Sequence, residues 1–235
     1  MNRIICFTLL LLCGCQSYRT ESTFQDTNLT YDSGEVSTQQ NIAPEFLVSP
    51  EGIGRAKLGM TLRELKQISD RETEFELIPA FATGLDAIAV SDQGLVQYYI
   101  LYETDTEETL PQSASNDDSL ITMLLTSNYN YQTEEGIKVG TPIQEAEDIY
   151  GDAVLAYNTD GESVEYITFN NYETPNIRFT ASYFKLISDG LGYAGIYPEY
   201  PGATYTTDKY QSDAAIAAIE VSCTEETCSQ YLSSE

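Results

Sequence analysis

Carboxylates and tyrosine hydroxyls are the commonest groups in this sequence that could take part in chemistry. The 235 residues include 37 Asp and Glu, 18 Tyr and 5 Cys, but neither His nor Trp. Without histidine, the chain holds no Ser-His-Asp or Cys-His nucleophile, no imidazole base and no His-bearing zinc site. Chemistry would depend on carboxylates, Lys, Tyr or Ser, or on a cation held by oxygen ligands. We predict that the protein is not an enzyme and uses neither a metal nor a cofactor.

One acidic segment has a spacing that resembles a calcium loop. Asn158, Asp160 and Glu162 alternate around Gly161, but the twelfth position of such a loop is Phe169, where the EF-hand pattern needs Glu. We therefore predict a hairpin turn in this segment, with calcium-linked stabilisation as the alternative.

The charge excludes several classes of partner. The net charge is −26, because 37 acidic residues face only 11 Lys and Arg. Binding to nucleic acid or to an anionic lipid surface needs a basic face, which so few cations cannot build. The acidic stretches 103–108 and 116–118 are interpreted as solvated loops, with weak cation binding as the alternative.

A tyrosine-rich segment near the C-terminus is the candidate partner surface. Tyrosine beside Pro and Gly provides rigid contact area at a small entropic cost. The alternative is a loop whose rings cover the edge of a sheet. The candidate residues are Tyr193, Tyr197, Tyr200 and Tyr205.

The N-terminus has the layout of an export signal. One Arg precedes an apolar run of about ten residues, which is too short to span a bilayer permanently. The run ends in Leu12-Cys13-Gly14-Cys15, which is similar to a bacterial lipobox. We expect cleavage after residue 14 and a lipid anchor on Cys15 that holds the protein at a periplasm-facing membrane surface. Gln16 favours the outer membrane, and an ordinary signal peptide is the alternative.

The remaining cysteines agree with export. Cys6 and Cys13 leave with the signal peptide and Cys15 carries lipid, so Cys223 and Cys228 remain. In an oxidising compartment they are expected to form a structural disulfide that closes a C-terminal loop. A redox-active pair is the alternative, but the two glutamates between the cysteines disfavour a reactive thiolate.

Composition and an internal repeat divide the chain into four parts. Residues 1–14 are the signal peptide, and residues 15–50 form a flexible, polar and acidic tether. Residues 51–127 form a first α+β repeat. Residues 128–235 form a second α+β repeat, which includes the disulfide loop.

Each repeat is predicted to begin with a glycine at positive φ and a capped helix. The helices are expected near residues 62–69 and 142–150, with Pro142 at the first helical position, where its missing N–H needs no partner. A threonine caps each helix, and an acid or amide three residues later completes a capping box. These residues are Gly59, Thr61 and Glu64 in the first repeat and Gly140, Thr141 and Gln144 in the second.

Strand signals follow each helix. Alternating Tyr, Ile and Val residues are bounded by turn residues, among them Asp92-Gln93-Gly94. The sequence leaves open whether all strands join in one sheet. The expected strands are 85–91, 95–103 and 120–127 in the first repeat and 154–158, 164–170, 177–183 and 214–222 in the second.

The glycine-centred motifs carry a resemblance to known families. Leu58-Gly59-Met60-Thr61 resembles the "LGMT" helix start of SmpA/OmlA lipoproteins, which belong to the outer-membrane assembly machinery, and of the tandem units of β-lactamase-inhibitory protein (BLIP). Residues 136–140, with Tyr150-Gly151, resemble a block in uncharacterised bacterial periplasmic proteins. The resemblance covers residues 50–222. It implies an α+β fold of two tandem helix-plus-antiparallel-sheet repeats, BLIP-like, more than it implies a function.

These features together predict a membrane-anchored bacterial envelope lipoprotein. Its expected role is a non-catalytic binding or scaffold module for a periplasmic or outer-membrane protein partner. The alternative is a carboxylate-dependent hydrolase acting on envelope glycans, which needs a cleft with two convergent acids.

Overall fold

The computed structural model describes residues 42–104, 116–158, 164–181, 193–198, 204–224 and 229. The chain divides into two units, Met1–Gln39 and Gln40–Glu235. The first unit, which contains Cys15, lies outside the described residues, as do Tyr200 and Cys228 of the second. Within the described part, no helix is long and apolar enough to cross a membrane.

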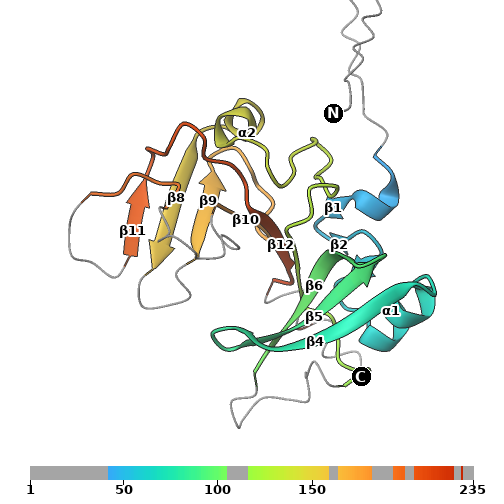
Figure 1. The fold of residues 1–235 in the computed structure, drawn as a ribbon. Helices are drawn as coiled ribbons and strands as arrows, with labels where there is room; N and C mark the ends of the chain where they lie inside the picture. Colours follow the sequence, from blue (N-terminus) through green and yellow to red (C-terminus); the bar gives the residue numbers. More distant parts are fainter. Residues whose placement is uncertain are drawn as a thin grey trace, which may run out of the picture. The chain divides into compact units, whose positions relative to one another are not determined.

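A nine-stranded antiparallel sheet forms the framework of the second unit (Figure 1). Its strands are β4 (Thr73–Ala82), β5 (Leu85–Asp92), β6 (Leu95–Glu103), β7 (Met123–Thr126), β8 (Ala153–Asn158), β9 (Glu165–Phe169), β10 (Ile177–Thr180), β11 (Thr204–Thr207) and β12 (Ala218–Ser222). Their order in the sheet is β11-β8-β9-β10-β12-β7-β6-β5-β4. Strand β7 pairs with β12, so strands from both expected repeats belong to one continuous sheet.

Two helices cover the same face of this sheet. Helices α1 (Leu62–Ile68) and α2 (Ile143–Tyr150) contribute their buried side chains to one hydrophobic core with β5–β10 and β12. Burial of apolar surface between helix and sheet is the main stabilising contribution of this layer. The α+β class expected from the sequence is confirmed.

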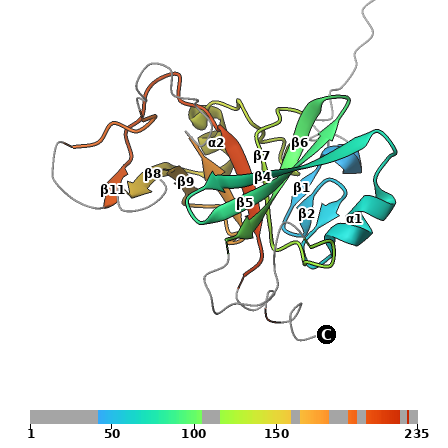
Figure 2. The same cartoon turned by 60° about the horizontal axis from the view of Figure 1, so that its bottom comes forward.

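A small three-stranded sheet adds to the same core. It consists of β1 (Val48–Ser49), β2 (Gly52–Ile53) and β3 (Ala56–Lys57), after a 3-10 turn at Pro44–Phe46. Strand β2 lies against β7 and β12, and Figure 2 shows the small sheet beside α1. Because Val48 is buried in the core, ordered structure begins within the residues that the sequence assigned to the tether.

Helix α1 begins as the sequence predicts. Thr61 is the N-cap, and its Oγ1 accepts a hydrogen bond from the N–H of Glu64 at 3.2 Å. The Thr61 N–H donates in return to Oε2 of Glu64 at 2.8 Å, which completes the capping box. Gly59, two residues earlier, has the expected positive φ of 83°.

Removing this cap should weaken the protein measurably. We expect Thr61→Ala to lower the free energy of unfolding by about 1 kcal/mol, because the Glu64 N–H loses its acceptor. Urea denaturation followed by circular dichroism measures the change. Thr61→Ser, which keeps the hydroxyl, should stay close to wild type, and an equal loss in both variants would contradict a capping role.

Helix α2 begins differently from the prediction. Its N-cap is Pro142 and not Thr141, and it has no side-chain cap, so the capping box assigned to Thr141 and Gln144 is wrong. Thr141 Oγ1 instead accepts a hydrogen bond from the N–H of Lys138 at 3.0 Å. The reason is that Pro142 has no N–H to donate, so the reciprocal half of a capping box cannot form.

Backbone pairing takes the place of the missing cap. Each helix start forms three matching backbone hydrogen bonds with the segment that precedes a central strand, β7 for α1 and β12 for α2, and α1 adds a fourth from the Arg63 N–H to the Asp117 carbonyl. The pairing supplies a partner for the first helical N–H, which a helix alone leaves unsatisfied. For α1 the pairs are Gly59 N–H to Ile121 O, Ile121 N–H to Met60 O and Leu62 N–H to Ser119 O; for α2 they are Gly140 N–H to Ile216 O, Ile216 N–H to Thr141 O and Ile143 N–H to Ala214 O.

This pairing also explains why two strands are shorter than predicted. The expected strands 120–127 and 214–222 begin only at Met123 and Ala218, because the residues before them bind the helix starts. The hairpin of β5 and β6 agrees with the sequence, and Gln93 and Gly94 adopt the positive φ values, 50° and 77°, of its turn.

The sequence analysis missed both edge strands, β4 and β11. Strand β4 is largely exposed, contains Pro79 and has a bulge between Ile78 and Ala82, so it lacks the clean alternation of a half-buried strand. Strand β11 has four residues, Thr-Tyr-Thr-Thr, which is too short for a pattern to be recognised.

Candidate functional site

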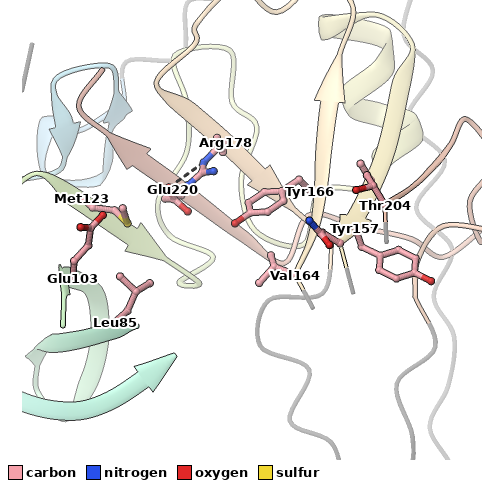
Figure 3. A pocket seen from close by; sticks show the side chains of 11 residues that line it. Leu85, Glu103, Met123, Tyr157, Val164, Tyr166, Arg178, Thr204 and Glu220 are labelled. Atoms are coloured by element: carbon pink, nitrogen blue, oxygen red, sulfur yellow. Dashed lines mark hydrogen bonds and ion pairs between the residues drawn. The ribbon is translucent and has the colours of Figure 1, made fainter. Parts of the chain in front are cut away.

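A groove of about 490 Å³ crosses the sheet face opposite the helices (Figure 3). On the central strands the side chains in it alternate with those of the helix-covered core, for example Tyr166 and Arg178 with Ile167 and Phe179. Eight of the nine strands, all except β4, contribute to its lining. The groove therefore depends on the continuity of the sheet across β7 and β12.

An ion pair lies in the middle of the groove. Arg178 on β10 and Glu220 on β12 are directly opposite in register. Both Nε (3.0 Å) and Nη2 of Arg178 donate to Oε1 of Glu220, whose side chain is 3% exposed. The guanidinium also lies over the ring of Tyr166, 4.9 Å from its centroid. Glu220 and Tyr166 thus hold Arg178 in place.

The end of the groove formed by β5, β6 and β7 is apolar except for one acid. Leu85 and Met123 line it together with the exposed carboxylate of Glu103. Leu85 belongs to a second hydrophobic cluster, against which Met123 and, from β4, Ile78 and Phe81 pack. This end of the groove therefore offers an apolar surface beside one carboxylate.

A tyrosine cluster, Tyr157, Tyr193, Tyr197 and Tyr205, lies beside the opposite end of the groove. Tyr157 is two residues from Leu155 on β8, so its side chain belongs to the helix-covered face of the sheet. Tyr157 stacks on Tyr193 at 4.0 Å and on Tyr205 at 4.9 Å between ring centroids, and meets Tyr197 edge-on at 4.7 Å. Three of the four tyrosines singled out in the sequence thus come together, whereas Tyr200 lies outside the described residues. Tyr157 was missed, although it pairs directly with Tyr205 across β8 and β11.

A fully buried carboxylate anchors this cluster. Glu165 on β9 is 0% exposed and accepts hydrogen bonds from the N–H groups of Ala194 (2.8 Å) and Gly195 (2.7 Å). Its Oε1 also accepts from the Tyr197 hydroxyl at 2.7 Å. Burial, and then this hydrogen bond, raises the pKa of Tyr197, so the hydroxyl stays a donor. Glu165 therefore ties the segment that carries Tyr193 and Tyr197 to the sheet.

Glycine is required at the centre of that segment. A Cβ on Gly195 would lie 2.7 Å from the Tyr197 ring and 2.8 Å from Thr207. The close approach lets the Gly195 N–H reach Glu165. Sequence reasoning missed Glu165 and Glu220 because nothing in the local pattern distinguishes two buried glutamates among 37 acids.

The described acidic loop is paired with helix α1. Asp117 bonds Lys66 at 2.7 Å, and Asp118 bonds Arg63 at 2.8 Å. The hydrogen bonds from Arg63 hold the pKa of Asp118 below its usual range. Among the described residues no group of three or more acids or cysteines is placed to hold a metal ion. The remaining loop residues, 105–115 and 159–163, lie outside the described part, so the calcium alternative at 158–162 is not tested.

The predicted disulfide is also only half described. Cys223 follows β12, and its N–H donates to the carbonyl of Thr122 at 2.9 Å. Cys228 lies outside the described residues, so its pairing with Cys223 stays a prediction.

Comparisons with known proteins give no family. No protein-family model and no curated protein matches the sequence. Among solved structures, the crystal structure of the uncharacterized protein yfeY from Escherichia coli is similar, with a TM-score of 0.44 and 15% identity over 75% of this chain and 99% of that chain. A likeness this weak carries no argument about function. The resemblance to SmpA/OmlA lipoproteins and to BLIP stays a prediction.

Proposed function

We propose that the protein is a lipid-anchored bacterial envelope protein whose folded unit binds an envelope partner without catalysing a reaction. The observation that carries this proposal is the groove across eight strands of one sheet. Its floor is held by the Arg178–Glu220 ion pair. A concave, largely preformed site with a few oriented polar groups is typical of binding sites.

We further propose that the folded unit consists of two tandem BLIP-like repeats, residues 51–127 and 128–235. The matched backbone hydrogen bonds at the two helix starts support this division. The groove would then lie across the junction of the repeats at β7 and β12, where neither repeat alone could form it.

The membrane anchor rests on Cys15, which we propose is lipidated and holds the unit at the outer membrane on its periplasmic side. In cells given a labelled fatty acid, the wild-type chain should carry the label and fractionate with membranes. Cys15→Ala should lose both properties, whereas Cys13→Ala, which leaves the modified residue in place, should keep them. Label retained in Cys15→Ala would refute the anchor.

The binding role is tested at the groove itself. A photoreactive amino acid in place of Met123 should cross-link an envelope component in cells, because Met123 lines the groove. The same amino acid in place of Asp148, exposed on α2, is the matched control. No cross-linked component from position 123, or equal cross-linking from both positions, would contradict the proposal.

A glycan hydrolase is supported less well. Among the described residues, the groove lining contains two carboxylates, Glu103 and Glu220. A glycosidase needs two acids that are free to act on one bond, whereas Oε1 of Glu220 already accepts two hydrogen bonds from Arg178. Turnover of cell-wall glycan that is abolished by both Glu103→Gln and Glu220→Gln would replace the binding proposal with this one.

A further inference from the structure

We propose that another pocket, on the helix-covered side of the sheet, binds a small primary alkylammonium group. This pocket holds about 140 Å³. It lies between the 3-10 turn, the turn that joins β2 and β3, the C-terminal end of α1 and strands β5 and β6. The inference is independent of the groove and goes beyond the proposed function. Four features carry it: a hydroxyl without a partner, a wall of aromatic rings, an excess of carboxylates and the size of the pocket.

The hydroxyl of Tyr98 points to a ligand. Tyr98 lines the pocket but is only 5% exposed. Within the part of the chain that the structure describes, its hydroxyl has no hydrogen-bond partner, whereas the neighbouring Tyr131 hydroxyl donates to Gln97 at 3.5 Å. Burial raises the pKa of Tyr98, and the other electrostatic influences on it come from Tyr131 and Arg55, two residues of the same pocket, so the hydroxyl faces the pocket. A ligand that hydrogen-bonds to this hydroxyl would recover the free energy that its burial costs.

Aromatic rings form one wall of the pocket. Tyr131 packs edge-on against Phe46, with 5.6 Å between the ring centroids, and edge-on against Tyr98, with 6.1 Å between them. Phe46 is 36% exposed, although it is a large apolar side chain. Aromatic rings pack against alkyl groups and attract cations through the negative potential of their faces. This wall therefore suits an alkyl chain that ends in a positive charge.

The charge of the lining favours a cation over an anion. Among the described residues, Glu45, Asp70 and Asp92 face a single guanidinium, that of Arg55, which gives the lining a net charge of −2. Arg55 is already engaged, because its Nη1 lies 3.0 Å from Oδ2 of Asp70 and donates to the carbonyl of Ile68 at 3.3 Å. Glu45 and Asp92 have no ion-pair partner within the described part of the chain. They are the two acids that an added cation would neutralise.

These two carboxylates lie near the tyrosine hydroxyls. Burial, and then the charge of Asp92, raises the pKa of Tyr131 to about 12; Glu45 adds to this effect, and Arg55 opposes it. The negative charges are therefore felt at the same end of the pocket where Tyr98 lacks a partner. A primary ammonium, with several N–H donors, can bond to the Tyr98 oxygen and to carboxylates at once.

The volume limits the ligand to a small group. At about 30 Å³ for each water molecule in the liquid, about 140 Å³ holds roughly five waters, and hence a group of about five non-hydrogen atoms. The n-butylammonium ion has this size. A lysine side chain ends in the same group, so the ligand is either a free amine or a lysine of another chain.

NMR titration of the wild-type protein with n-butylammonium tests the proposal, with the amide signals of Tyr98 and Tyr131 as the readout. Three probes match n-butylammonium in their number of non-hydrogen atoms: tetramethylammonium has no N–H, n-butanol has no charge, and propionate has the opposite charge. We expect n-butylammonium to bind most tightly, and propionate not to bind. An N-acetylated Gly-Gly-Lys-Gly-Gly peptide is the lysine probe.

Substitutions at the pocket should act on this binding. Tyr98→Phe should weaken it about three- to tenfold and leave the stability of the protein unchanged, because the hydroxyl that it removes has no partner. Glu45→Gln combined with Asp92→Asn should weaken it about five- to tenfold. Asp148→Asn, at an exposed position of α2, is the matched control and should change the affinity less than about twofold.

Each outcome supports or overturns the proposal. Tighter binding of propionate than of n-butylammonium would mean that Arg55 selects an anion, and would overturn it. So would equal affinities for n-butylammonium and tetramethylammonium, an unchanged affinity in Tyr98→Phe, or binding of neither n-butylammonium nor the lysine peptide. Binding of the free amine alone identifies a free amine as the ligand, and equal binding of the peptide identifies a lysine side chain. The proposed function rests on the groove and stands in every case.

Discussion

Arg178→Met should lower the free energy of unfolding by about 2–3 kcal/mol at neutral pH. The substitution leaves the Glu220 carboxylate, whose side chain is 3% exposed, without its cation. Breaking a fully buried pair costs about 3–5 kcal/mol, and we expect less here because 46% of the Arg178 side chain is exposed. Urea denaturation of the purified protein measures the difference.

Two variants make this prediction specific. Arg178→Met combined with Glu220→Gln should recover part of the lost stability, because the double variant buries no uncompensated charge. Arg63→Met breaks the exposed pair with Asp118 and should cost much less stability than Arg178→Met. If the single substitutions at Arg178 and Arg63 cost the same, the groove pair is not the buried, organising contact that the geometry indicates.

Glu165→Ala should destabilise the protein by about 2–4 kcal/mol and loosen the tyrosine cluster. The substitution leaves the N–H groups of Ala194 and Gly195 and the Tyr197 hydroxyl without their acceptor in a buried position. Urea denaturation reports the stability. Near-ultraviolet circular dichroism reports the packing of the rings, because stacked tyrosines in a fixed geometry give a strong signal.

Partial substitutions separate the contributions at this anchor. Tyr197→Phe removes one donor and should cost about 1 kcal/mol. The loss of stability in Glu165→Gln should lie between those of Tyr197→Phe and Glu165→Ala. The amide oxygen accepts some of the hydrogen bonds, but the NH₂ group faces other donors. Glu76→Ala, at an exposed position of β4, controls for the loss of a glutamate. Unchanged near-ultraviolet dichroism in Glu165→Ala would show that Glu165 does not order the cluster.

The two buried glutamates organise opposite faces of the sheet. Glu220 orients Arg178 in the groove, and Glu165 holds the tyrosines on the helix-covered face. A site organised before the ligand arrives loses less conformational entropy on binding. Stability and binding should therefore fall together when Glu220 is replaced.

Local signals in the sequence predict the elements that local contacts stabilise. The start of α1 follows from Thr61 and Glu64, which are three residues apart and complete their hydrogen bonds within one turn. The turn between β5 and β6 follows from Gln93 and Gly94. In these cases the partners are neighbours in the chain, so their spacing carries the information.

Local signals do not predict how α2 begins. Thr141 has the right residue type and a suitable position, but the N–H of Ile143 finds its acceptor in the carbonyl of Ala214, 71 residues later (214 − 143). No local pattern reveals such a partner. The edge strands β4 and β11 were missed for a related reason, since their pairing with β5 and β8 and not their own alternation makes them strands.

Composition alone determined the absence of imidazole chemistry and the strongly acidic character, and it led to the expectation of a binding protein. The repeated glycine motifs predicted the two helices. The tertiary structure decided that the strands form one sheet, that three of the expected tyrosines meet Tyr157, and that two of 37 acids become buried, Glu220 in the groove and Glu165 beside the tyrosines. The physical reason is burial. A carboxylate acquires a structural role when distant strands remove it from water and place donors around it, and sequence spacing does not encode that event.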